Sequence, residues 1–409
     1  MSTVAAPGYR DDHLHLLACA AARRSIDVRG AATVSELLET VQRGIRERDR
    51  AGDATSWLRV WGYDDALLAE RRHPTVAELD AVTFGRPAVL HHLTGHVAVV
   101  NTAAGRALGL GAGEVLVERH DVLAAVPRPE RAEIVAELAA VLADLAAHGI
   151  RACTDATHTN DLAALELLAD AVAAAPAVSV TAMVGANRLE SLGGLVFGAR
   201  VYSSATAPSE TGSTPTSGAD GDTREAAGAS GVRANVRIGH AKVMPPHDDD
   251  SAIDELVATA RVHGFPVAIH AMDIDTMQAA LDALEAHPPA RHADTVDRIE
   301  HCALALPEQL DRIARLGVAV VTQPSFVTRR APKYRDQLSA AEQQWLWPLA
   351  SLLRRGIRVT LSSDAPTVPA DPTEWMAAAI GRDLAPAERV DAATALRLCA
   401  APQPGCEHS

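Results

Sequence analysis

Short runs rich in β-branched residues alternate along the chain with longer Ala-, Leu- and Glu-rich stretches whose apolar residues recur at helical spacing. This alternation predicts βα units, and therefore a parallel sheet covered by helices. A glycine closes several helical stretches, at 148–150, 263–265, 316–318 and 355–357, and releases the chain into the next strand. Eight βα units favour an α/β fold, a closed (β/α)8 barrel of the TIM type. The expected strands are Tyr9–His15, Ile150–Asp155, Val178–Val184, Val236–Val243, Pro266–His270, Arg298–Cys302, Val318–Gln323 and Arg358–Asp364.

Two segments interrupt this rhythm. Residues 56–110 follow the first strand, are too long for a plain crossover and contain WLRVWGYDD and RPAVLHHLTGHVAVVN, so we expect an inserted subdomain near the barrel mouth. Residues 203–231 are small and polar, with a single Arg and no large apolar side chain, and predict a flexible low-complexity loop. Otherwise residues 1–409 are expected to form a single barrel, with helices such as Arg128–His148 and Ser251–His263.

Composition and charge exclude several classes of protein. Residues of the set AVILMFWYC make up 48% of the 409 residues, which excludes global disorder. With 38 Lys and Arg against 52 Asp and Glu, the net charge is −14, so the chain lacks the basic footprint of a binder of nucleic acid or anionic membranes. The five cysteines form no C-x-x-C pair, and the N-terminus lacks the layout of a signal peptide. We therefore expect a soluble, cytoplasmic protein with free thiols and no membrane span.

The candidate chemistry begins at Asp11-Asp12-His13-Leu14-His15 in the first predicted strand. Because residues i and i+2 of a strand point to the same side, His13 and His15 would both project into the barrel, where they could hold one metal ion. An H-x-H pair alone is weak evidence, since two satisfied or surface histidines explain it as well.

Four more polar residues stand at or near the C-terminal ends of predicted strands, where barrel enzymes place their active sites. They are Lys242, His270, His301 and Asp364. Each alone has an ordinary explanation: the histidines as hydrogen-bonded core residues, Asp364 as a helix N-cap, and Lys242 as a surface residue with a packed stem. Together with the first pair, they bring four histidines, a carboxylate and an amine to one mouth of the barrel.

The order of several segments resembles the amidohydrolase superfamily, in particular its amidohydrolase-3, YtcJ-like branch. PGYRDDHLHLL is similar to the first metal-binding strand of that branch. Further segments are similar to its other characteristic segments, in the same order: WGYDDALLAERRHPTVAELDAV, RPAVLHHLTGHVAVVNTAA, DRIEHCALALPEQLDRIARLGVAVVTQPSF and LSSDAPTVPADP. The similarity covers nearly the whole chain, from Pro7 to about Leu398.

This resemblance implies a site for two divalent metal ions, usually zinc. His13 and His15 would hold the more buried ion, and His270 and His301 the other. Asp364 would bind the first ion and be the catalytic residue, taking a proton from the attacking water and passing it to the leaving nitrogen. The ions would activate water as a hydroxide and polarise the substrate oxygen.

Lys242 matches a lysine that many members of the family carry as a carbamate bridging the two ions. The usual Asp-Gly after it is replaced here by Pro245-Pro246-His247-Asp248, so His240 or His247 could enter the site instead. Asp11 and Glu300 stand next to the ligands in sequence and could orient the histidines, or could be solvated or helix-capping carboxylates.

The substrate side is less defined by the sequence. Four residues are candidates for substrate binding, each with a structural role as the alternative: His96, Asn101, Gln323 and Tyr334. Typical members flank the barrel with a β-sandwich built from the two chain ends, but here about eight residues precede the first strand and 45 follow Asp364. The sandwich is therefore expected to be largely absent, and apolar surface left uncovered would favour a homodimer.

These observations predict a metal-dependent hydrolase that cleaves a non-peptide C–N bond, of the amide type, in a small-molecule substrate. Two alternatives stay open at this point. The chain could be a catalytically impaired or scaffolding barrel, or the same metal site could act on an ester, on a deaminable ring or in an isomerisation.

Overall fold

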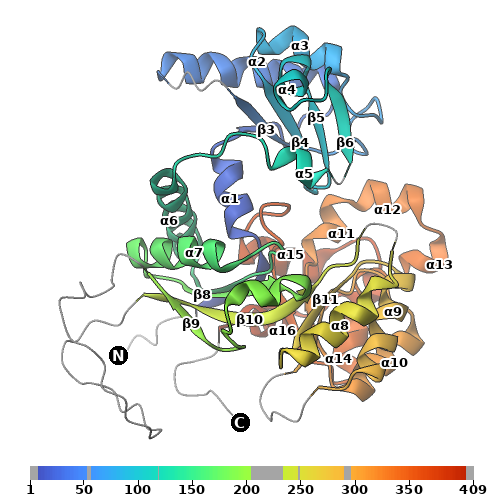
Figure 1. The fold of residues 1–409 in the computed structure, drawn as a ribbon. Helices are drawn as coiled ribbons and strands as arrows, with labels where there is room; N and C mark the ends of the chain where they lie inside the picture. The colour runs from blue at the N-terminus through green and yellow to red at the C-terminus, as the bar shows by residue number, and fades with distance from the viewer. Residues whose placement is uncertain are drawn as a thin grey trace, which may run out of the picture.

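The computed structural model describes residues 8–52, 57–117, 119–203, 234–246, 249–289 and 296–401. Within these residues the chain forms two β-sheets, one of them a barrel and the other a separate five-stranded sheet (Figure 1). The predicted loop at 203–231 lies outside the described residues except for Ser203, and so does His247. Across the described ranges, no helix is both long and apolar enough to cross a bilayer.

The barrel is built from eight parallel strands that occur where the sequence predicts them. Each strand is hydrogen-bonded to the next along the path, and a bridge between Leu14 and Ala365 brings the last strand back to the first. This arrangement confirms a nearly closed TIM-type barrel. In order around the barrel the strands are β1 (Tyr9–Leu14), β7 (Ile150–Asp155), β8 (Ser179–Gly185), β10 (Asn235–Val243), β11 (Val267–Ala271), β12 (Arg298–His301), β13 (Ala319–Thr322) and β14 (Val359–Leu361), and β9 (Arg200–Tyr202) pairs with β10 outside this path.

Helices between the strands bury their apolar faces against the barrel in one large core cluster. The predicted glycines end helices with a positive φ, as at Gly264 (73°) and Gly317 (68°), a conformation that costs glycine little. The last helix begins at Ala392, where Asp391 caps it by accepting a hydrogen bond from the Thr394 N–H. The helices around the barrel are α1 (Leu16–Arg23), α6 (Arg131–Ala147), α7 (Leu162–Ala174), α8 (Ala252–Val262), α9 (Ile274–Ala286), α10 (Pro307–Leu316), α14 (Leu349–Arg354), α15 (Pro372–Gly381) and α16 (Ala392–Cys399).

Shorter helices occupy the loops between these elements, and several lie near the mouth of the barrel. α11 and α12 follow β13 and lead toward the second sheet (Figure 1). The short elements are η1 (Ala186–Leu192), α11 (Ser325–Arg329), α12 (Ala331–Gln337), α13 (Ala340–Gln343) and η3 (Pro386–Glu388).

The second sheet lies between β1 and β7 in sequence and above the barrel in Figure 1. It has its own core, in which α2 buries Leu37, Val41 and Ile45, residues spaced at helical intervals along one face. This unit spans more of the chain than the insertion expected at 56–110, since it also includes β2 and α2 before that range and β6 after it. Its elements are β2 (Ile26–Asp27), α2 (Val34–Arg50), β3 (Leu58–Tyr63), α3 (Val76–Thr83), β4 (Ala88–His92), β5 (Val97–Val100), α4 (Thr102–Ala107), β6 (Glu114–Val117) and α5 (His120–Leu123).

Candidate metal centre

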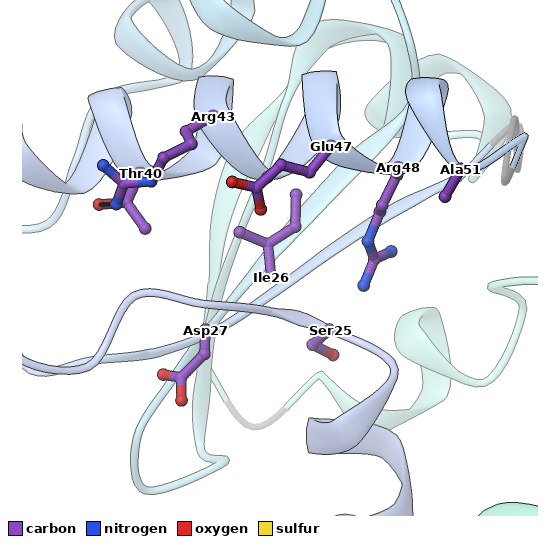
Figure 2. A pocket seen from close by; sticks show the side chains of 9 residues that line it. Ser25, Ile26, Asp27, Thr40, Arg43, Glu47, Arg48 and Ala51 are labelled. Atoms are coloured by element: carbon purple, nitrogen blue, oxygen red, sulfur yellow. Dashed lines mark hydrogen bonds between the residues drawn. The ribbon is translucent and has the colours of Figure 1, made fainter.

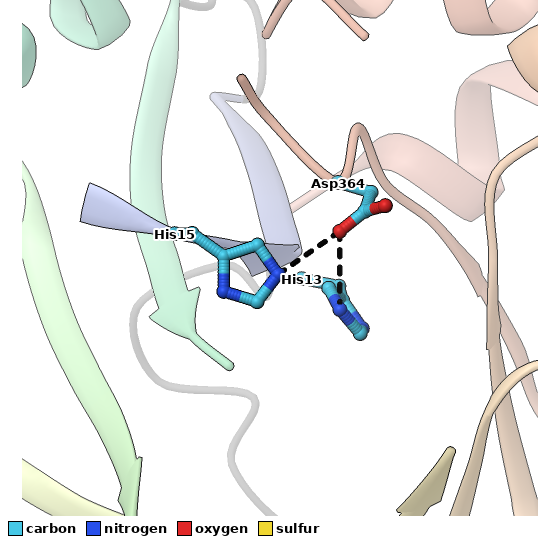
Figure 3. Close-up of side chains that lie close together, drawn as sticks. All are labelled: His13, His15 and Asp364. Carbon is cyan, nitrogen blue, oxygen red and sulfur yellow. Dashed lines mark hydrogen bonds and ion pairs between the residues drawn. The ribbon is translucent and has the colours of Figure 1, made fainter. Parts of the chain in front are cut away.

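The first group of ligand-type side chains joins the end of β1 to the segment after β14 (Figure 3). His15 Nε2 lies 3.1 Å from Asp364 Oδ1, and His13 Nε2 lies 3.4 Å from the same oxygen. His15 and Asp364 are 349 positions apart in the chain, and they meet because β1 and β14 are neighbours in the nearly closed barrel. One ligand atom from each lies within 4.8 Å of the others, which suits a single cation.

The second pair of histidines extends this group across the mouth. His270, on β11, has its ring centroid 4.6 Å from that of His301, on β12. The His301 ring is in turn 4.7 Å from the ring of His13, so the two pairs form one continuous cluster. The structure therefore brings together the four histidines and the aspartate that the sequence predicted at strand ends.

Backbone geometry at the strand ends helps to aim these side chains. His301 has a φ of 70° and Asp364 a φ of 63°, both in the left-handed region that costs a non-glycine residue free energy. The Asp364 N–H donates to the His13 carbonyl at 2.7 Å, which holds this turn against β1. This geometry explains why β14 ends at Leu361, earlier than the sequence predicts, and why Asp364 lies beside His13.

Hydrogen bonds at Nδ1 orient three of the rings. His15 Nδ1 lies 3.0 Å from Thr157 Oγ1, and His301 Nδ1 lies 2.8 Å from Gln323 Oε1. His13 Nδ1 contacts the carboxylate of Glu300. Because each partner can accept a proton, each ring can carry its hydrogen on Nδ1 and keep the lone pair of Nε2 for a metal ion.

The two predicted orienting carboxylates have different roles. Glu300 contacts the His13 ring as expected, and Arg298 donates to its other oxygen. Asp11 instead accepts from the Ser363 hydroxyl at 2.6 Å and from the backbone N–H groups of Ser363 and His13. Asp11 therefore ties the end of β1 to the segment after β14, and among the described residues it bonds no histidine ring.

Lys242 is buried among the histidines at the end of β10. Its Nζ has no hydrogen-bond partner among the described residues, and its charge acts on His13, His270 and His301. Burial lowers the pKa of Lys242 to about 8, although the charges of Glu300 and Asp364 act in the opposite direction. An unpartnered amine in this position needs a further polar group to satisfy it.

The electrostatics of the cluster suit metal binding. Burial is the main cause that lowers the pKa values of His13 and His270 well below the usual imidazole value, so both rings are neutral at pH 7. Burial alone would raise the pKa of Asp364, but its contacts with His15 and His13 outweigh burial and hold that pKa below its usual value. Neutral nitrogens beside an ionised carboxylate form the donor set that zinc prefers.

The sequence model of the amidohydrolase family matches residues 3–402. This chain belongs to the amidohydrolase family. It is 25% identical to the putative amidohydrolase YtcJ of Bacillus subtilis (strain 168), over 92% of this chain and 73% of that protein. It is 28% identical to the N-substituted formamide deformylase of Arthrobacter pascens, over 96% of this chain and 77% of that protein.

Solved structures share the fold of this chain. An uncharacterized metal-dependent hydrolase from Pyrococcus furiosus aligns with a TM-score of 0.66 at 22% identity, over 96% of this chain and 80% of that one. Another from Pyrococcus horikoshii OT3 aligns with a TM-score of 0.69 at 20% identity, over 96% of this chain and 79% of that one. These likenesses agree with the barrel described above.

The structure gives different surroundings to the residues predicted to bind substrate. His96, between β4 and β5 of the second sheet, is half-buried, and its charge acts on His270. Gln323 is buried and orients His301, as described above. Tyr334 packs against an apolar cluster that also contains Trp347. His96 is thus the one of these four that approaches the histidines from the second sheet.

Asn101 has a structural role in the second sheet. Its Nδ2 donates to Thr83 Oγ1 and to the Arg86 carbonyl, both at 2.9 Å, and its Oδ1 accepts from the N–H groups of Ala88 and Ala104. All its amide hydrogen-bonding positions are used within the second sheet, so we leave Asn101 out of the proposed site.

The structure also decides which other residues join or leave the site. His240 Nε2 donates to the Val296 carbonyl at 3.0 Å, and its ring packs against Phe197. These contacts hold the His240 side chain away from the histidine cluster at the barrel mouth. Thr157 and Trp347, whose ring centroid is 6.4 Å from that of His301, were missed. Thr157 does follow β7 by two positions, so the strand-end rule applied to that strand would have found it.

A second group of ligand-type residues lies in the second sheet. His92 Nε2 is 3.2 Å from Asp65 Oδ1 and 3.6 Å from Asp64 Oδ1. Arg330, from the segment between α11 and α12, approaches Asp64 Oδ2 to 3.8 Å. This group therefore joins the second sheet to the barrel through charged side chains.

Proposed function

We propose that this protein is a metal-dependent hydrolase that cleaves a non-peptide C–N bond, of the amide type, in a small molecule. The observation that carries the proposal is the convergence of four histidine rings, Asp364 and the unpartnered amine of Lys242 at the barrel mouth. Family membership supports hydrolysis, and the relative named as an N-substituted formamide deformylase supports the bond class.

In this proposal His13, His15 and Asp364 hold one divalent ion, and His270 and His301 hold the second. When bound, two such ions, zinc in our proposal, would supply Lewis acidity and lower the pKa of a water molecule. The residues present fit this chemistry, because their nitrogen and carboxylate atoms are the ligands that zinc takes.

Lys242 is proposed to be carboxylated and, as a carbamate, to help hold the metal ions. Its neutral amine would add to the carbon of CO2 and release one proton, which yields a carbamate with two ligand oxygens. The lowered pKa of about 8 keeps part of the amine neutral near pH 7, and burial without a hydrogen-bond partner leaves Nζ free to react.

The protein's own groups would handle the proton. Water adds to the substrate carbonyl carbon, and Asp364, ionised because its pKa is held low, accepts the proton that the water releases. As the C–N bond breaks, Asp364 returns this proton to the leaving nitrogen, so that an amine and a carboxylic acid result. Glu300, Thr157 and Gln323 keep three rings oriented during this cycle.

The test replaces Asp364 by Asn and measures hydrolysis of a panel of N-substituted formamides, N-acyl amines, lactams and aryl esters. Asp364→Asn should lower kcat on the preferred amide by at least about 100-fold, the usual range for a proton-transfer group, with an unchanged circular dichroism spectrum. Asp371→Asn is the matched control, since Asp371 caps α15 and Asn caps equally well.

Three results would overturn the proposal. One is full activity of Asp364→Asn, and another is preferred hydrolysis of the aryl esters over every amide. The third is purified, active protein without bound divalent metal.

A further inference from the structure

A cleft of about 640 Å³ lies where the second sheet meets the barrel, and arginines dominate its walls. Two glutamates of α6, Glu133 and Glu137, also line it, together with Trp57 at the start of β3. The arginines come from the end of α1, from α2, from β3 and from the segment before α6: Arg23, Arg24, Arg48, Arg59 and Arg128. None of the proposed metal ligands lines this cleft.

The carboxylates in the cleft hold only part of this positive charge. Arg23 Nε lies 3.2 Å from Glu137 and Arg23 also contacts the carboxylate of Asp144, while Arg24 lies 3.5 Å from Glu133. Arg59 donates instead to the Pro127 carbonyl at 2.5 Å, a contact that positions its guanidinium without neutralising it. Five arginines from four segments thus line a cleft whose own walls carry two glutamates, in a chain whose net charge is −14.

A backbone contact links two of the elements that carry these arginines. Arg48 donates to the carbonyl of Arg24, so the last turn of α2 is tied to the end of α1. Arg48 also borders a neighbouring hollow of about 490 Å³, where it reaches down from α2 toward Ser25 (Figure 2). Burial, and next the charge of Arg24, lower the pKa of Arg59, as expected where like charges are crowded. A bound anion would relieve this repulsion.

We propose that this arginine cleft binds a small polyanion that carries at least two phosphoryl groups, as nucleoside diphosphates and triphosphates do. Arginine presents forked N–H donors that match phosphate oxygens, and several arginines on separate elements can surround more than one phosphoryl group. Trp57 adds an aromatic side chain to the same wall, which suits a ligand with a planar ring.

The experiment measures binding to the full chain by isothermal titration calorimetry with pyrophosphate, with ADP, and with orthophosphate and citrate for comparison. Pyrophosphate and ADP should bind saturably with a stoichiometry of one. Orthophosphate and citrate should bind at least about tenfold more weakly, since a charge-assisted contact contributes about that factor. Saturable ADP binding at least as tight as pyrophosphate would show that the wall beside Trp57 contributes.

Three variants decide where the anion binds. Arg59→Ala and Arg128→Ala should each raise the Kd for pyrophosphate at least about tenfold. Arg128→Ala is included because the Arg128 side chain is exposed and less needed for folding. Arg46→Ala is the matched control, because Arg46 is exposed on α2 and bonds only Gln42 among the described residues. It should leave the Kd unchanged.

Pyrophosphate also chelates divalent metals, so the titration is repeated on His13→Ala, which removes a proposed metal ligand. Binding that persists there supports the arginine cleft, and binding that disappears there overturns it. The proposal also fails if the wild-type chain shows no saturable binding of pyrophosphate. Unchanged affinity in both Arg59→Ala and Arg128→Ala, in folded protein, contradicts it as well.

Discussion

Two regions of this molecule collect histidine and carboxylate side chains at ligand spacing, and they differ in the hydrogen bonding of the second ring nitrogen. At the barrel mouth, His15 Nδ1 faces a hydroxyl that can accept its proton. In the second sheet, His92 Nδ1 faces the Thr94 hydroxyl at 2.8 Å but also accepts from the Thr94 backbone N–H at 3.2 Å, which favours the tautomer with its hydrogen on Nε2, toward Asp65. Proximity alone is therefore a poor guide to metal binding, since in both groups one ligand atom from each residue lies within 4.8 Å of the others.

The nearby cations differ as well. Asp64 faces the cationic guanidinium of Arg330, which takes the place that a metal ion would have. The barrel mouth has Lys242, whose pKa is lowered to about 8, so that it can lose its charge when ions bind. The comparison favours the proposed metal centre at the barrel mouth, and at Asp64 an ion pair that joins the second sheet to the barrel.

The largest expected effect separates the two groups by metal content. His13→Ala should lose bound metal and more than about 100-fold in kcat/KM, beyond what the loss of an orienting residue costs. His92→Ala should keep the bound metal and the kcat/KM of the wild type, because Nε2 of the His92 ring carries a proton and not a metal ion. Elemental analysis of the purified variants checks this, and loss of metal in His92→Ala would place a third ion in the second sheet.

The next effect concerns stability. Asp64→Asn leaves Arg330 buried without its carboxylate and should lower the free energy of unfolding by about 3 kcal/mol, with metal content unchanged. Asp65→Asn is the matched control, because the Asp65 side chain is 36% exposed and its ion pair should contribute less than about 1 kcal/mol. Urea denaturation measures the free energy of unfolding of both variants. Equal losses of stability would show that Asp64 is not the residue that joins the second sheet to the barrel.

A pH effect follows from the same residue. Burial would raise the pKa of Asp64, but His92 and Arg330 outweigh burial and lower it to about 2. A folded pKa below the unfolded value of about 3.9 means that the stabilisation is complete above pH 4 and is lost as the pH falls toward 2. This loss should be on the order of 1–2 kcal/mol, and it should be absent in Asp64→Asn when unfolding is followed across that window.

The smallest effect tests the orienting hydrogen bonds. Thr157→Val keeps the side-chain shape but removes the acceptor for His15 Nδ1, and it should weaken metal binding about tenfold with little change in stability. Thr94→Val removes the matching hydroxyl beside His92, 2.8 Å from Nδ1, and should leave metal affinity unchanged. A competition titration with a chelator compares them, and equal affinities in the two variants would contradict the distinction.

The strands and the metal-centre side chains were predictable because their signals are local. A parallel strand shows itself as a short apolar run, and the residue at its C-terminal end is marked by its polarity, as at His270 and His301. The extent of the second sheet was less predictable, since β2 is two residues long and has no periodicity to detect. His96 and Asn101 stand five positions apart in one segment, yet the first approaches His270 and the second caps α4.

By itself, the sequence determined the order of strands, the helices between them and the polar residues at strand ends, because period and residue type act over a few neighbouring positions. Only the tertiary structure decided which of those residues share a site and in which tautomer. Those depend on partners such as Thr157 and Glu300, 142 and 287 positions from their histidines. Such partners meet only when the barrel closes, and no local pattern encodes that distance.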